Sequence, residues 1–250
     1  MTQALILAVS AFAAGAINAI AGGGTLIAFP ALLAAGYSAK VANVTNTVAI
    51  WPGNVGGSFA YRGEIYRQRR TLLALSLPII VGSLAGSALL LATPESAFEV
   101  IVPFLIFGAC ALLALQERLT LMFFRGDRSL AAGRNLLLLR IGIFLVAIYG
   151  GYFGAAIGII MLAIFGLLLP EDIQSANALK GIIAMLINGI AVVYFGIFGE
   201  VAWEAAAVMA VCALGGGYVG VAVARRLPRG RLRMVAVIYG TVAGLYLLFR

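Results

Sequence analysis

The side chains that could bind a ligand are polar groups lying inside long, uncharged, apolar stretches of the chain. In the first half they are Asn18, Thr25, Thr45, Asn46, Thr47, Asn54 and Ser58, and in the second half Asn177, Lys180 and Asn188. Amides and hydroxyls donate and accept hydrogen bonds, and an ammonium group offsets the charge of an anion. The set therefore favours non-covalent binding of a small anion. The alternative is that these groups only join neighbouring helices, at about 0.6 kcal/mol per hydrogen bond.

The residues that most enzymes use for acid–base or metal chemistry are missing from these stretches. The sequence has no histidine, which excludes a Ser-His triad and histidine-ligated metals. All nine Asp and Glu residues lie in loops or near the ends of apolar stretches, and Cys110 and Cys212 lie far apart in separate apolar runs. We therefore expect no enzymatic activity, no cofactor and no bound metal.

The composition places the chain in a lipid bilayer. Hydrophobic residues make up 63% of the 250 residues and charged residues only 10%, and the mean hydropathy is +1.09. A soluble domain carries about 25% charged residues, so polar side chains here are too few to cover a globule. The net charge of +8 comes from short arginine clusters between apolar runs, a distribution typical of membrane-protein loops. Nucleic-acid binding is therefore not expected.

The uncharged stretches predict about eight membrane segments, because a spanning helix needs about 20 apolar residues. These stretches are 3–39, 41–61, 71–94, 100–116, 141–170, 181–199, 205–224 and 234–249. Two of them, 3–39 and 141–170, are too long for one straight helix and too short for two. Each is therefore expected to hold a full helix and a shorter re-entrant piece, or else a single kinked and tilted helix.

Both long stretches contain a glycine-rich interruption, at Gly22, Gly23 and Gly24 in the first and at 150–158 in the second. Glycine costs about 1 kcal/mol per residue within a helix, so these runs predict helix breaks. A helix that begins after the break, at Thr25 or Ile159, would point unpaired N–H groups with partial positive charge at a ligand. Anions bind at such helix ends. The alternative role of the glycines is tight helix packing.

The distribution of arginine predicts the orientation of the chain. Arginines cluster around 62–70, 118–134 and 225–233, whereas the loops at 95–99 and 200–204 carry glutamates. Basic loops face the cytoplasm, so the three arginine loops are predicted to be inside and both termini outside. Inside and outside loops alternate along the chain as predicted only if the stretch 141–170 enters and leaves the membrane on the same side.

The chain also repeats itself after about 130 residues. Residues 17–33 match 152–168, Asn46 and Asn177 follow in similar settings, and each repeat closes its next span with a Gly-Glu pair, at 63–64 and 199–200. One pair is predicted inside and the other outside. The sequence therefore predicts an all-α polytopic membrane protein of two inverted repeats, 1–115 and 136–250, joined by a cytoplasmic linker at 116–135. Such repeats with broken helices are typical of secondary transporters.

The motifs A-I-N-A-I-A-G-G-G-T-L-I-A-F-P-A-L-L-A-A-G and V-A-N-V-T-N-T-V-A resemble the first repeat of the sulfite exporter TauE/SafE family, and G-G-Y-F-G-A-A-I-G-I-I-M-L followed by A-N-A-L-K resembles the second. The resemblance covers nearly the whole chain. It implies an exporter or permease for sulfite, sulfoacetate or another organosulfonate, multi-pass in a bacterial inner membrane. A homodimer is a further possibility, and a membrane scaffold without transport activity is the competing hypothesis.

Lys180 is the one charge that falls well inside the apolar part of the second repeat. It follows Asn177 by nearly one helical turn, so both side chains share a helix face. We expect Lys180 to offset the charge of a bound sulfonate or sulfite, with Asn46 and Asn177 supplying hydrogen bonds. The alternative is that its ammonium group snorkels to the interface beside Glu171 or Asp172.

Overall fold

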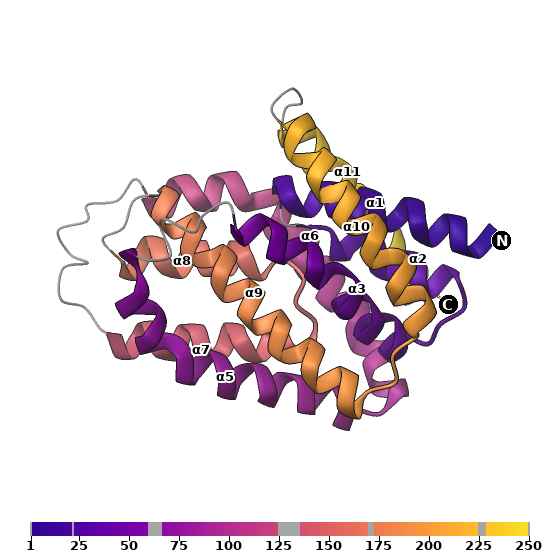
Figure 1. Ribbon diagram of the computed structural model, residues 1–250, viewed down its shortest axis with the longest axis horizontal. Coiled ribbons are helices and arrows are strands. Elements are labelled where there is room, and N and C mark those ends of the chain that lie inside the picture. The colour runs from indigo at the N-terminus through magenta and orange to yellow at the C-terminus, as the bar shows by residue number, and fades with distance from the viewer. Residues whose placement is uncertain are drawn as a thin grey trace.

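The computed structural model describes residues 2–21, 23–59, 67–124, 136–169, 173–224 and 229–249, which form ten helices (Figure 1). The helices of the first half are α1 (Thr2–Ala21), α2 (Thr25–Ala34), α3 (Ala39–Phe59), α5 (Arg69–Ala92) and α6 (Glu95–Phe124). Those of the second half are α7 (Leu136–Tyr152), α8 (Ile157–Leu168), α9 (Ile173–Phe198), α10 (Trp203–Ala224) and α11 (Arg229–Leu248). The expected all-α fold class is confirmed.

Several of the described helices are apolar enough for a membrane environment. Among the described residues, three helices are long and apolar enough to cross a membrane: α5, α9 and the part of α6 from Glu95 to Phe123. Six shorter apolar helices accompany them. The outer faces are apolar as well, because on α5 Leu77 is 70% exposed while Leu75 is buried. A helix pairs its own backbone N–H and C=O groups, which is required in lipid because lipid offers them no hydrogen-bond partners. The chain is therefore a multi-pass membrane protein.

Each glycine-rich interruption separates a longer helix from a short one. The helix α1 ends at Ala21 and the 10-residue α2 begins at Thr25, while α7 ends at Tyr152 and the 12-residue α8 begins at Ile157. The predicted start of the second short helix at Ile159 was therefore wrong by two residues. The chain turns there through left-handed backbone at Gly154 (φ 78°) and Ala156 (φ 60°), which allows α8 to begin directly after Ala156.

Two helix pairs pack through glycines, α1 with α10 and α5 with α7; the second pair lies side by side along one edge of the molecule in Figure 1. A Cβ on Gly15 would overlap the carbonyl of Ala213 in α10. In the other pair, a Cβ on Gly82 would lie 2.6 Å from the carbonyl oxygen of Phe144. Small residues allow such backbone contact, which drives helix association in lipid.

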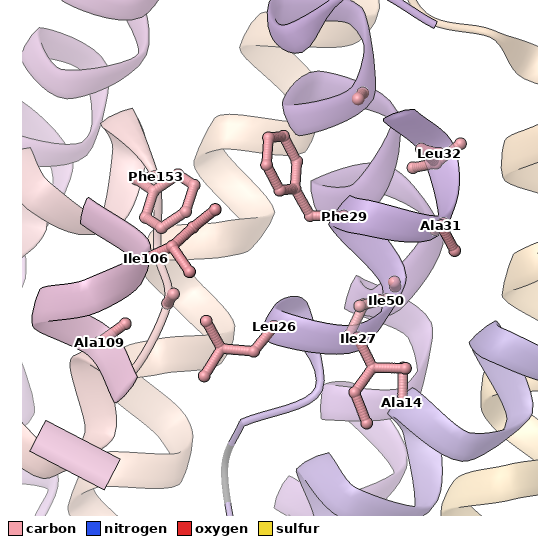
Figure 2. Packing of buried hydrophobic residues seen from close by; sticks show 14 of the residues in the cluster. Ala14, Leu26, Ile27, Phe29, Ala31, Leu32, Ile50, Ile106, Ala109 and Phe153 are labelled. Atoms are coloured by element: carbon pink, nitrogen blue, oxygen red, sulfur yellow. The ribbon is translucent and has the colours of Figure 1, made fainter. Parts of the chain in front are cut away.

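The hydrophobic core fixes the short helices in place. Phe29 of α2 and Phe153 of the α7–α8 break meet edge to face, with ring centroids 5.8 Å apart (Figure 2). Ile106 and Ala109 of α6 and Leu26 of α2 belong to the same buried cluster, shown in Figure 2. A second cluster lies among α5, α7, α8 and α9. The start of α8 is thus held by side chains from both halves of the chain.

The predicted linker at 116–135 agrees with the structure only in part. The helix α6 continues to Phe124, so the predicted linker at 116–135 begins within a helix, and its remainder lies outside the described residues. Gly22, the pair at 63–64 and the acidic residues at 171–172 also lie outside them. The orientation predicted from the arginine loops stays a prediction.

Candidate functional site

Polar side chains form a stripe along α3. Asn43, Asn46, Thr47 and Asn54 recur at the spacing of one helix face and extend about 16 Å at 1.5 Å per residue. Thr47 donates its hydroxyl hydrogen bond to the carbonyl of Asn43 (3.0 Å). Thr45 points elsewhere and accepts a hydrogen bond from the amide N–H of Ala202 (3.0 Å). The stripe thus consists mainly of amides that face other parts of the protein.

At the first break, the stripe meets the end of α1. Asn18 donates its Nδ2 hydrogen bond to Oδ1 of Asn54 (2.6 Å). Gly24 packs against α1, because a Cβ there would overlap the carbonyl of Ala14 and lie 2.9 Å from Cβ of Asn18. A Cβ on Gly23 would instead meet the side-chain end of Leu113 at 2.6 Å. Gly24 therefore has a packing role, and ligand approach at the glycines stays a prediction. Thr25, half-buried, is the first residue of α2.

At the second break, two amides approach from different helices. Asn43 of α3 donates its Nδ2 hydrogen bond to the carbonyl of Tyr152 (2.9 Å), the last residue of α7. Oδ1 of Asn188 in α9 lies 3.5 Å from the position that a Cβ of Gly154 would take. Tyr149 closes the turn by donating its hydroxyl hydrogen bond to the carbonyl of Ala155 (2.9 Å).

Lys180 lies beside the first turn of α8. Its Cδ is 3.0 Å from the position that a Cβ of Gly158 would take, so a side chain at position 158 would crowd the lysine stem. Its Nζ donates a hydrogen bond to Oδ1 of Asn177 (2.9 Å), as their shared helix face predicts. The N-terminus of a helix carries partial positive charge. Lys180 and the start of α8 therefore bring two positive features together, which favours an anion between them.

The structure brings the predicted site residues into separate groups. Asn18 and Asn54 meet at the first break, Asn177 and Lys180 lie beside α8, and Asn188 lies at the second break. The sequence reasoning missed Asn43, which is fully buried and contacts the second break directly. The signal was present, because an Ala-Asn pair begins the polar stripe of α3 at 42–43 and that of α9 at 176–177.

The sequence reasoning also missed Lys40, the only other lysine in the chain. Its Nζ donates hydrogen bonds to the carbonyls of Leu91 (3.0 Å) and Thr93 (2.7 Å), at the end of α5. Its backbone N–H donates to a carboxylate oxygen of Glu95 (3.0 Å), which begins α6. Lys40 therefore joins three helix ends and has a structural role.

Apolar multi-pass helices, two of them broken beside buried amides and a lysine, define a membrane transport protein. The chain belongs to the sulfite exporter TauE/SafE family, whose model matches residues 7–247. This confirms the family resemblance carried by the motifs of both halves.

Curated relatives align with the chain over most of their length. The chain is 28% identical to the probable membrane transporter protein YfcA of Escherichia coli K12, over 100% of this chain and 92% of that protein. It is 27% identical to a probable membrane transporter protein of Haemophilus influenzae, over 91% and 87% of the two chains. A probable membrane transporter protein of Sinorhizobium, ORF9, is also 27% identical, over 86% and 80%. No solved structure matches the chain.

Proposed function

We propose that this chain is a secondary transporter that exports a small anion, sulfite or an organosulfonate such as sulfoacetate, by alternating access across a bacterial inner membrane. The observation that carries the proposal is the position of Lys180 beside the first turn of α8. A sulfonate or sulfite would accept hydrogen bonds from the ammonium group and from the N–H groups that begin α8. Asn177 orients the lysine through its Oδ1.

The pattern of helix contacts supports an inverted repeat for this transporter. If α1, α2, α3, α5 and α6 are exchanged with α7, α8, α9, α10 and α11, the contact of α1 with α10 becomes that of α7 with α5. In the same way, the contact of α3 with α10 becomes that of α9 with α5, and that of α2 with α11 becomes that of α8 with α6. In this scheme α2 and α8 are the re-entrant pieces, and the two halves rock around them.

The same exchange favours a different residue pairing from the one expected for Asn46 and Asn177. Asn43, Asn46 and Asn54 on α3 have the same spacing as Asn177, Lys180 and Asn188 on α9. Trp51 and Met185 are partners in this register, and they contact each other where α3 crosses α9: the indole Nε1 donates a hydrogen bond to the carbonyl of Met185 (3.0 Å). A contact between equivalent residues is expected on a twofold axis. In this register Asn46 is the counterpart of Lys180.

Counterflow of labelled sulfite and sulfoacetate in proteoliposomes tests the proposal. Lys180→Ala should abolish counterflow while the protein reconstitutes normally, because the ammonium group that offsets the anion is gone. Lys40→Ala is the matched control: it removes the other lysine, lowers stability by releasing the carbonyls of Leu91 and Thr93, and should leave counterflow per folded molecule intact. Normal counterflow in Lys180→Ala, or none in the unmodified protein with either anion, refutes the proposal.

A further inference from the structure

Two buried amide oxygens on α3 have no hydrogen-bond donor within the part of the chain that the structure describes. They are Oδ1 of Asn43 and Oδ1 of Asn46, whose residues are 0% and 2% exposed. The two residues are three positions apart, so their side chains share a face of α3. Buried polar atoms in proteins are almost always hydrogen-bonded, so a pair without a donor on one face points to a missing partner.

The orientation of the Asn43 amide follows from its other contact. Nδ2 donates to the carbonyl oxygen of Tyr152, and a rotated amide would place two oxygens against each other. Oδ1 is therefore the atom of Asn43 that has no donor within the described ranges. The missing partner must supply positive charge or a hydrogen-bond donor.

The equivalent place in the second half of the chain holds a cation. On α9, the residue three positions after Asn177 is Lys180, whose Nζ donates to Oδ1 of Asn177 (2.9 Å). On α3, the residue three positions after Asn43 is the neutral Asn46, and Oδ1 of Asn43 has no donor among the described residues. The same arrangement of an asparagine oxygen thus meets an ammonium group in one half, and in the other it meets no donor from the described parts of the chain.

The end of α7 adds to the negative character of this place. Asn43 contacts Tyr152, the last residue of α7, where a helix carries partial negative charge on its final carbonyls. Asn188 donates Nδ2 within its own helix to the carbonyl of Ala184 (2.8 Å), and its Oδ1 is directed to Gly154 in the same break. The carbonyl oxygen of Tyr152 and Oδ1 of Asn188 therefore lie at the break, and Asn43 of α3 reaches it through Nδ2.

We propose that Asn43 and Asn46 bind a monovalent cation, sodium, at the C-terminal end of α7. Neutral oxygens suit a monovalent ion, whereas magnesium and calcium sites are built around carboxylates. The α7–α8 break would then hold a cation at the end of one helix and the transported anion at the start of the next. Coupling between the two ions rests on the proposed anion transport, but sodium binding itself does not.

Thermal unfolding of the purified protein in detergent tests sodium binding without any transported anion. Sodium chloride should raise the unfolding temperature by about 5–10 °C at about a hundred times its Kd, relative to choline chloride at equal ionic strength. Asn46→Leu has a similar volume without the oxygen and should abolish the shift. Asn46→Asp adds charge and should lower the half-saturating sodium concentration by about tenfold. The aspartate variant decides the question if the leucine variant does not fold.

Gln68 provides a matched control. Its Oε1 is also buried without a donor among the described residues, but its Nε2 donates to the carbonyl of Ser175 (2.9 Å), away from the α7–α8 break. Gln68→Leu should keep the sodium shift. Equal shifts with sodium and choline in the unmodified protein, or an undiminished sodium shift in Asn46→Leu, overturn the proposal and leave water as the partner of the two oxygens.

A second measurement separates this proposal from the proposed function. Lys180→Ala should lose sulfite counterflow and keep the sodium shift, whereas Asn46→Leu should lose the shift and the dependence of sulfite efflux on a sodium gradient. A sodium shift in a protein that never moves sulfite or sulfoacetate would refute anion transport and support the cation site. Efflux that ignores the sodium gradient in the unmodified protein refutes the coupling.

Discussion

Replacement of Gly24 by alanine should destabilise the protein, whereas the same change at Gly23 should be tolerated. A Cβ on Gly24 would overlap the carbonyl of Ala14 and lie 2.9 Å from Cβ of Asn18, and neither atom can move without moving α1. A Cβ on Gly23 would overlap the end of the flexible Leu113 side chain and otherwise make an ordinary 3.7 Å contact with Cβ of Ala236. Overpacking against rigid atoms costs about 1–3 kcal/mol, so Gly24→Ala should lower the unfolding temperature by about 2–12 °C.

The assay is thermal unfolding in detergent, followed by tryptophan fluorescence, with sulfite counterflow measured on the same samples. Gly108→Ala is the control, because a Cβ on Gly108 has nothing within 4 Å and alanine favours the helix. It should be neutral or stabilising. Equal unfolding temperatures for the Gly23 and Gly24 variants would refute the packing argument. Loss of counterflow in both variants without any loss of stability would support ligand approach at the glycines instead.

Three further outcomes are expected. Single cysteines at the exposed Arg70 and Glu200 should differ in intact cells: an impermeant thiol reagent should label position 200 and spare position 70, and labelling of both would refute the inverted orientation. Lys180→Arg should bind sulfite but turn over slowly, because a guanidinium fork replaces a point charge; normal turnover would show that the ammonium geometry is immaterial. Trp51→Phe should lower the free energy of unfolding by about 1 kcal/mol, because the hydrogen bond to the carbonyl of Met185 is lost. An unchanged unfolding temperature would contradict that contact.

The helix breaks could be predicted from the sequence because a run of glycines destabilises a helix at its own position, whatever the rest of the chain does. The first break falls where Gly22–Gly24 place it. The second helix start was misplaced by two residues, because the left-handed backbone at Ala156 has no signal in its residue type. Helix contacts such as Gly15 against Ala213 depend on residues far apart in sequence, and composition alone does not pair them.

The candidate site was predictable in its residue types but not in its partners. Lys180 was expected beside Asn177 from helical spacing, and the two are hydrogen-bonded. The Ala-Asn pair at 42–43 marked Asn43, but its contact with a carbonyl in α7 was not predictable, because no local pattern connects the two. The role of Gly24 likewise needed the position of α1, since a glycine that admits a ligand and one that admits a helix look the same in sequence.

The pairing of Asn46 with Lys180 leads to a last prediction. We propose that Asn46 helps to bind a sodium ion, whereas its counterpart Lys180 carries a positive charge on its own side chain. Asn46→Lys should then replace the bound ion with a covalently attached ammonium group. Its ammonium group would reach Oδ1 of Asn43 as Lys180 reaches Oδ1 of Asn177, three residues earlier on the same helix face. The variant should unfold at the same temperature in sodium and in choline, and should still bind sulfite through Lys180. A retained sodium shift would mean that the cation does not lie between these two asparagines, since an ammonium group and a sodium ion cannot share one oxygen pair without strong repulsion.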